Sequence, residues 1–466
     1  MLKQLFFSAA MAALSLAGQS IDRTKPPQTP PIPDYKLPPT YESKLPNGMA
    51  VVLVQDDRFP LVTARLNFQA GSRFDPKQTP GLAEAVAELL KSGTTTRTAR
   101  QISEEADDLG GTVTAMAGPD ALTVMGNGLS EKLTNLVALM ADISIHAAFP
   151  ADEVNLYKQN RLQNLRLQKS DPAFLSEEKF AEVIFGSSGY AHLAPTEQAI
   201  GQLDAKVLSQ FRDMYLVPNN ATLILIGRLP DRAKLLNTVT QSFGAWPQKE
   251  LPPAPALELP KTHREIVLVN RPGSVQADVH VGQLGPTRLN PDAFPLTVGE
   301  ALLGGGTNSR MFKDIRERDG FAYDAHSEYR PNRQAASVQA VTEVRNEVIE
   351  PALKATLAEL SDLSAPVKPD ELSNTKNFLS GTYLLRLETQ DGLARQLNTV
   401  KTLGLPMDYL ETYTTRVRSV EPDQIQAVAK KYLDPNQASI VVVGDAAKIG
   451  EPLKKFGSVT VVPANQ

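Results

Sequence analysis

Alternating hydrophobic and polar positions predict two sets of strands and helices along this chain. Leu61–Phe68 and Val275–Val281 alternate as half-buried strands do, and an apolar helical pattern follows each of them. Helical spacing also covers Val207–Tyr215 and Ile425–Tyr432, and a β-branched run follows each after a Pro-Asn turn. Both halves of the chain are therefore predicted to be α+β units.

The two halves are similar in sequence. Tyr215–Gly227 (YLVPNNATLILIG) returns 217 residues later as Tyr432–Gly444 (YLDPNQASIVVVG). A proline-rich segment lies between the copies, and prolines interrupt helices and central strands. We therefore predict a first domain over residues 45–245, a linker over 246–262 and a second domain over 263–466.

The N-terminal segment has the features of a secretory signal peptide, which we place at residues 1–20. Lys3 precedes the apolar run Leu5–Ala17, which ends in small residues. At about 13 residues this run is too short to span a bilayer, so no membrane insertion is expected. Residues 21–44 are rich in proline and are predicted to form an extended arm. We expect a periplasmic or secreted protein.

Composition excludes several classes of function. A formal net charge of −4 on 466 residues provides no basic face for nucleic acid, and the absence of cysteine excludes thiolate metal sites and disulfides. Two histidines would have to lie three or four residues apart to face one metal from a single helix. No pair among the five has that spacing: His146, His192, His263, His280 and His326.

The most informative segment is Leu302–Tyr323, LLGGGTNSRMFKDIRERDGFAY. A helical pattern begins at Ser309 or Arg310 and ends at Asp319, with an apolar stripe of Met311, Phe312 and Ile315. Gly320 is the residue expected where the chain leaves the helix in a left-handed conformation. Because Arg316 lies in the last turn and Tyr323 just beyond the reversal, their side chains can converge on one point.

This segment resembles the second-half signature of the pitrilysin-type (M16) zinc metallopeptidases, and the resemblance covers about residues 45–457. In that family an arginine and a tyrosine with the spacing of Arg316 and Tyr323 meet the substrate at a zinc centre. The resemblance implies two homologous halves, each a sheet packed with helices, that together form half of a clamshell chamber.

The zinc ligands of the family are missing. The family's H-x-x-E-H helix follows a phrase like Ala70–Arg73 (AGSR), and that register places Glu84 and Glu88 at the histidines and Ala87 at the catalytic glutamate. The family's third ligand, a later glutamate, falls near Asn164 in QNRLQNLRLQ. We therefore predict no metal in this chain. Glu84 and Glu88 are expected to form a solvated helix face.

The chemistry implied for Arg316 and Tyr323 is stabilisation of charge. Peptide hydrolysis places negative charge on the carbonyl oxygen, which a guanidinium and a phenol can both stabilise by hydrogen bonds. The alternative is structural: Arg316 would pair with a neighbouring carboxylate such as Asp319, and Tyr323 would be a core strand residue.

A glycine turn, Gly304-Gly305-Gly306-Thr307, begins this segment. No lysine follows in the GK[ST] order, so a phosphate loop is not predicted. Glycines let the backbone approach closely, either for helix packing or to admit an extended peptide beside a strand edge. We predict that Gly304, Gly305, Gly306 and Thr307 bind substrate.

Together these features predict a noncatalytic subunit of a heterodimeric zinc endopeptidase, inactive alone. A homologous H-x-x-E-H partner would hold the zinc and the general base, and the substrates would be peptides or small unfolded proteins. The alternative is a structural or peptide-binding protein derived from a peptidase. A neighbouring reading frame that encodes H-x-x-E-H would favour the enzyme subunit.

Overall fold

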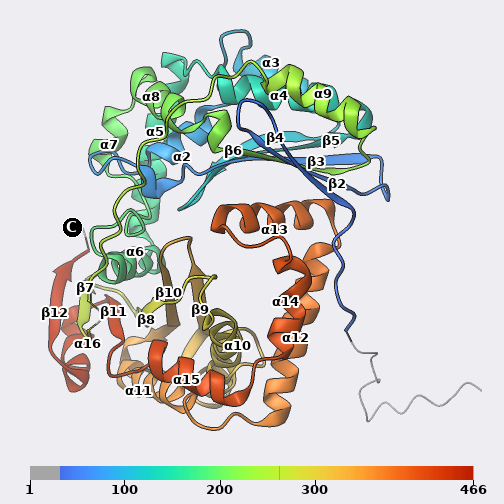
Figure 1. The fold of residues 1–466 in the computed structure, drawn as a ribbon. Coiled ribbons are helices and arrows are strands. Elements are labelled where there is room, and N and C mark those ends of the chain that lie inside the picture. The colour runs from blue at the N-terminus through green and yellow to red at the C-terminus, as the bar shows by residue number, and fades with distance from the viewer. Residues whose placement is uncertain (1–31, 262, 465–466) are drawn as a thin grey trace, which may run out of the picture. The chain divides into compact units, whose positions relative to one another are not determined.

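The computed structural model describes residues 32–261 and 263–464, whose strands form two six-stranded mixed sheets (Figure 1). The predicted signal peptide and residues 21–31 of the predicted arm lie outside the described residues. The first sheet has the order β1 (Thr40–Lys44), β2 (Ala50–Gln55), β6 (Ala221–Gly227), β3 (Leu61–Phe68), β5 (Leu122–Leu129) and β4 (Thr112–Ala117). The second has the order β12 (Val459–Pro463), β7 (Ile266–Asn270), β11 (Ser439–Gly444), β8 (Gln276–Gly285), β10 (Ala336–Arg345) and β9 (Ala322–Pro331).

Five strands of each sheet follow the same topology. In both sheets a parallel pair, β2 with β6 and β7 with β11, is followed by three antiparallel strands. The sixth strand differs, because β1 comes from the N-terminal side and pairs antiparallel, whereas β12 comes from the C-terminal side and pairs parallel. The predicted duplication and the α+β class are confirmed.

The helices of the described chain fall into the same two sets. The first half contains α2 (Leu82–Leu89), α3 (Ala99–Asp108), α4 (Leu133–Ile145), α5 (Ala151–Ser170), α6 (Pro172–Phe185), α7 (Glu197–Gln202), α8 (Ala205–Tyr215) and α9 (Arg232–Phe243). The second contains α10 (Ala293–Gly304), α11 (Ile349–Asp362), α12 (Pro369–Leu387), α13 (Gln390–Leu403), α14 (Tyr409–Arg418), α15 (Pro422–Tyr432) and α16 (Ala446–Leu453). Single short turns are η1 (Ser72–Phe74), η2 (Ser130–Lys132), η3 (Pro218–Asn220), η5 (Asn346–Val348) and η6 (Lys454–Phe456), and η4 (Phe312–Arg318) is a π-helix.

The elements predicted from periodicity lie where expected. Strand β3 has the predicted bounds, and β8 begins one residue later than predicted. Helices α8 and α15 contain the two predicted helical segments and begin two and three residues earlier. Side-chain caps explain these earlier starts, since Asp204 accepts the Val207 amide and Glu421 forms a capping box with Gln424.

Each sheet has helices from its own half on one face and one helix from the other half on the opposite face (Figure 1). Helices α2 and α4 pack on the first sheet, and α13 from the second half packs on β3 and β6. Helices α10 and α11 pack on the second sheet, and α6 from the first half packs on β8 and β11. This exchange joins Asp34–Gln466 into one compact unit.

The two exchanged helices use different chemistry. Helix α13 meets a polar sheet face, where Arg65 Nη2 lies 2.5 Å from Asp391 Oδ1 and Asn67 donates to Asn398 at 2.9 Å. Helix α6 meets a mixed face, where Phe180 packs in one buried cluster with Val441 and Ser176 Oγ lies 3.0 Å from His280 Nε2.

The predicted linker and arm have simple structures where they are described. Residues 247–261 contain no helix or strand, and the last five residues of the predicted arm form β1. The predicted domain boundaries stay predictions. Among residues 32–261 and 263–464, no helix is both long enough and apolar enough to cross a membrane.

Candidate functional site

A π-helix and a left-handed glycine bring Arg316 toward Tyr323. In η4 the Asp319 amide donates to the Asp314 carbonyl at 3.0 Å, which is the five-residue spacing of a π-turn. Gly320 has φ +62°, as predicted, and β9 begins two residues later. The predicted helix is confirmed in position, but most of it is wider than an α-helix.

The two predicted catalytic side chains are in contact. The Arg316 guanidinium carbon lies 5.2 Å from the centre of the Tyr323 ring and 4.6 Å from that of Phe312. Such cation–π contacts hold a guanidinium in place without neutralising its charge. Phe312 is thus a positioning residue for Arg316.

The structural alternatives for these two residues are wrong. Asp319 pairs with Arg318, whose Nε lies 2.8 Å from Oδ1, and Arg316 makes no ion pair within residues 32–261 and 263–464. Tyr323 is 75% exposed, so it is not a core residue. A cation without a carboxylate and an exposed phenol are therefore both available to a molecule outside this chain.

The zinc-motif positions on α2 lie against α5. Glu84 Oε2 accepts from Arg161 Nη2 at 3.3 Å, and the Arg161 side chain is only 7% exposed. Arg161 also donates to Gln168 at 2.9 Å. Ala87, at the position of the catalytic glutamate, is buried.

This arrangement does not fit a zinc ion. A permanently charged guanidinium lies beside the first ligand position, where it would repel a metal cation. Partial burial and the Glu84 carboxylate raise the pKa of Glu88. Within the described residues, no group of three histidine, cysteine or acidic side chains could hold a metal.

Sequence reasoning missed Arg161. The expected solvated face is correct for Glu88, which is exposed, but Glu84 pairs with a buried cation. The signal was present in QNRLQNLRLQ, where Arg161 lies three residues before Asn164, the position expected for the third ligand.

The glycine turn serves two purposes. A Cβ on Gly304 would lie 2.0 Å from the Ser327 amide nitrogen, so this glycine permits close packing of α10 on β9. A Cβ on Gly306 would meet nothing nearer than Phe378 Cζ at 3.7 Å. Helix packing, one of the two interpretations of these glycines, therefore accounts for Gly304.

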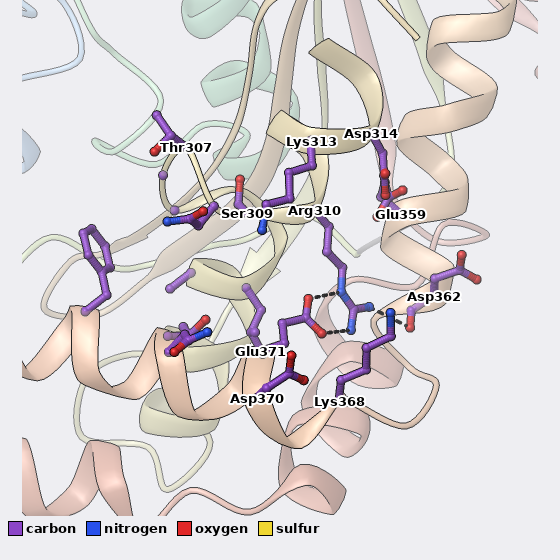
Figure 2. A pocket seen from close by; sticks show the side chains of 18 of the residues that line it. Thr307, Ser309, Arg310, Lys313, Asp314, Glu359, Asp362, Lys368, Asp370 and Glu371 are labelled. Atoms are coloured by element: carbon purple, nitrogen blue, oxygen red, sulfur yellow. Dashed lines mark hydrogen bonds and ion pairs between the residues drawn. The ribbon is translucent and has the colours of Figure 1, made fainter. Parts of the chain in front are cut away.

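Gly305, Gly306 and Thr307 line a cavity of about 700 Å³ (Figure 2). Gly304, Arg316 and Tyr323 are not among its lining residues. The structure thus brings Arg316 to Tyr323, and places three of the four predicted substrate residues at a separate cavity.

Comparison with known proteins shows the family of this chain. Residues 50–185 match the family model described as insulinase, peptidase family M16, and residues 202–379 match the model of the peptidase M16 inactive domain. Together the matches cover about two thirds of the chain. The chain therefore belongs to the M16 peptidase family, as its sequence resemblance implied.

Relatives and solved structures match over nearly the whole chain. The uncharacterized zinc protease YmxG of Bacillus subtilis is 24% identical over 402 residues, which are 85% of this chain and 96% of the relative. The peptidase M16 inactive domain from Pseudomonas fluorescens superposes with a TM-score of 0.80 at 23% identity, covering 87% of this chain and 98% of that one. A protease from Helicobacter pylori superposes with a TM-score of 0.81 at 18% identity, covering 87% and 100%. The two structural matches show that the fold is shared.

Proposed function

We propose that this chain is the noncatalytic subunit of a heterodimeric M16 zinc endopeptidase. It supplies Arg316 and Tyr323 to bind substrate and to stabilise the tetrahedral intermediate at the zinc of a homologous H-x-x-E-H partner. The chain alone is inactive, and its substrates are peptides or unfolded proteins. The predicted signal peptide supports a location in the periplasm or outside the cell.

One observation carries this proposal: the half-buried Arg316 contacts the exposed Tyr323, and Arg316 has no acidic partner among the described residues. Guanidinium and phenol donors of this kind stabilise an oxyanion, and they need no metal in their own subunit. The Glu84–Arg161 pair supports the same division of labour, because it occupies the position where the first half would otherwise bind zinc.

The relatives support the reaction class. YmxG and the Rickettsia felis relative both carry the name zinc protease. This chain lacks the zinc motif but has the Arg316 and Tyr323 pair. A partner that has the motif best explains this combination.

The test is to purify the chain with and without an H-x-x-E-H homologue from the same genome, and to measure cleavage of a quenched peptide and zinc content. Turnover is expected only in the mixture. Arg316→Ala is expected to lower kcat on the order of 10²–10³-fold, with zinc content unchanged. Tyr323→Phe keeps the ring contact but removes one donor, so a smaller loss is expected.

Arg318→Ala is the matched control, since Arg318 lies in the same π-helix but is ion-paired and exposed. Its kcat should equal that of the wild-type complex. Unchanged turnover in both Arg316→Ala and Tyr323→Phe would remove the proposed role. Stable association without any turnover would favour the alternative, a peptide-binding protein derived from a peptidase.

A further inference from the structure

The cavity beneath the glycine turn is a site that the Arg316 and Tyr323 chemistry does not use. It lies between the C-terminal end of α10, the start of η4, the C-terminal end of α11 and the N-terminal half of α12 (Figure 2). Its volume of about 700 Å³ is in the range of small-molecule and peptide pockets.

Acidic groups outnumber basic groups in its lining. The five carboxylates are those of Asp314, Glu359, Asp362, Asp370 and Glu371, and the three cations are Arg310, Lys313 and Lys368. Arg310 and Glu371 neutralise each other through a bidentate pair with distances of 2.7 and 3.0 Å (Figure 2). Asp362 and Asp370 make no ion pair within the part of the chain that is described.

Two further features indicate that the lining lacks a partner. Ser309 lines the cavity and is only 4% exposed, yet its hydroxyl has no hydrogen-bond partner among residues 32–261 and 263–464. Unsatisfied buried hydroxyls are uncommon and are usually paired with water or a ligand. Asp314 and Glu359 face each other, and burial together with Asp314 raises the pKa of Glu359 to about 7. Asp314 pairs with Arg318 at 2.6 Å, so Glu359 is the carboxyl group of the two without an ion pair in the described residues.

Part of the remaining wall is apolar, although Asn308, Asn374 and Thr375 also line the cavity. Leu302, Pro366 and Phe378 line the apolar part, and Phe378 is 51% exposed although it is a large aromatic residue. A ligand with a charged head and a methylene stem would place the stem along these side chains and the head among the carboxylates.

We propose that this cavity binds the basic side chain of a peptide, a lysine ammonium or an arginine guanidinium. The Asp314 and Glu359 pair, Asp362 and the Ser309 hydroxyl accept hydrogen bonds from the cationic head. The cavity includes Gly305, Gly306 and Thr307, so its peptide ligand rests on the proposed function. The binding itself needs neither the partner chain nor turnover.

The test is calorimetric titration of the isolated chain with short peptides. The probe is acetyl-Ala-Lys-Ala-amide, and the matched probe has norleucine in place of lysine, which keeps the stem and removes the charge. A third probe, Ala-norleucine-Ala-amide with a free amino terminus, separates a side-chain cation from a terminal one. The lysine peptide is expected to bind at least about tenfold more tightly than either norleucine peptide.

Variants then locate the binding. Asp362→Asn, at an exposed helix end, and Glu359→Gln are each expected to weaken the lysine peptide about tenfold. Asp362→Lys should abolish its binding. Asp108→Asn is the control, because Asp108 is an exposed aspartate at the end of α3 and should leave affinity unchanged.

Equal affinity for the lysine and norleucine peptides, no measurable binding, or unaltered binding in Asp362→Lys would overturn the inference. If Glu359→Gln fails to fold by circular dichroism, the Asp362 variants still decide. Lysine-dependent binding without turnover in any mixture would support the binding site and contradict the heterodimeric enzyme. Turnover in the mixture without lysine-dependent binding would support the enzyme and contradict the binding site.

Discussion

The contact between α2 and α5 in the first half differs sharply from its counterpart between α10 and α12 in the second half. In the first half the Glu84–Arg161 pair joins the two helices. In the second half the corresponding helices border the open cavity, and Phe378 stands 217 residues after Arg161, the offset of the repeat. Of the two equivalent helix contacts, the one in the first half therefore has an ion pair, and the one in the second half borders a cavity.

The Glu84–Arg161 pair gives the first half an electrostatic link between α2 and α5, in which a guanidinium supplies the positive charge. In the second half Arg310 pairs with Glu371 at the cavity, while Asp362 and Asp370 make no ion pair among the described residues, so these two carboxylates remain accessible to a cation from elsewhere.

The largest effect is expected from rebuilding the metal site in the first half. Glu84→His, Ala87→Glu and Glu88→His restore the family motif, and Arg161→Glu replaces the guanidinium with a third ligand. The fourfold variant should bind zinc and gain about 4 kcal/mol of stability at a zinc concentration 1,000 times its Kd. Metal analysis after gel filtration and thermal melts measure both.

The variant that retains Arg161 but carries the other three substitutions is the control. It should hold no stoichiometric zinc, because the cation opposes the metal. Equal zinc in both variants would show that Arg161 does not close the site.

The next largest effect is expected at the end of α10. Gly304→Ala places a methyl group on the β9 backbone and should destabilise the chain by about 3 kcal/mol. Gly306→Ala is the matched control, since its Cβ would have space, and it should leave the melting temperature nearly unchanged. Similar melting temperatures for the two variants would contradict the assignment of Gly304 to packing.

A smaller effect is expected from weakening the ion pair in the first half. Glu84→Gln leaves the Arg161 guanidinium buried without a charged partner, and should destabilise the fold by about 1–2 kcal/mol because Glu84 is partly exposed. Glu88→Gln removes a carboxylate that repels Glu84, so its urea midpoint should be unchanged or slightly higher. Equal urea midpoints for Glu84→Gln and wild type would show that the Glu84–Arg161 ion pair does not stabilise the fold.

The smallest effect concerns the carboxyl pair of the second half. Because the folded-state pKa of Glu359 is raised to about 7, the protonated form stabilises the fold fully below about pH 4.5, and this stability is lost as pH rises through 7. The free energy of unfolding of Glu359→Gln, relative to that of wild type, should thus be higher at pH 8 than at pH 4.5. Asp314, Asp362 and Arg310 also act on this carboxyl.

Melting temperatures of both proteins across this range measure the difference. A constant gap between Glu359→Gln and wild type would mean that Glu359 titrates normally.

Much of the fold was predictable because the sequence repeats. The match of Tyr215–Gly227 to Tyr432–Gly444 predicted two equivalent strands, and these are β6 and β11 at the same place in the two sheets. The exchange of α6 and α13 was not predictable, since a hydrophobic face indicates burial but not which sheet covers it. The π-turns of η4 were also missed, because an apolar stripe of three residues fits both helix types.

The candidate site was predictable where it depends on local geometry. Gly320 reverses the chain between Arg316 and Tyr323, and one contact joins them as expected. The ion pair of Glu84 with Arg161 joins residues on different helices; the sequence placed Arg161 near the third ligand position but did not show which carboxylate it meets. Gly304 packs on β9, whereas Gly305, Gly306 and Thr307 line the cavity. This difference depends on how closely β9 approaches α10, and no sequence motif indicates that distance.

The reciprocal placement of α6 and α13 also bears on how this protein can be made or divided. Cleavage of one peptide bond within residues 247–261 should leave the fold intact, because the two fragments would stay associated. Producing either fragment alone would uncover a sheet face that normally meets a borrowed helix, and such a fragment should aggregate or fail to accumulate. Co-expression of both fragments should restore soluble, folded protein. The gene can therefore be split in this segment, but neither part can be omitted.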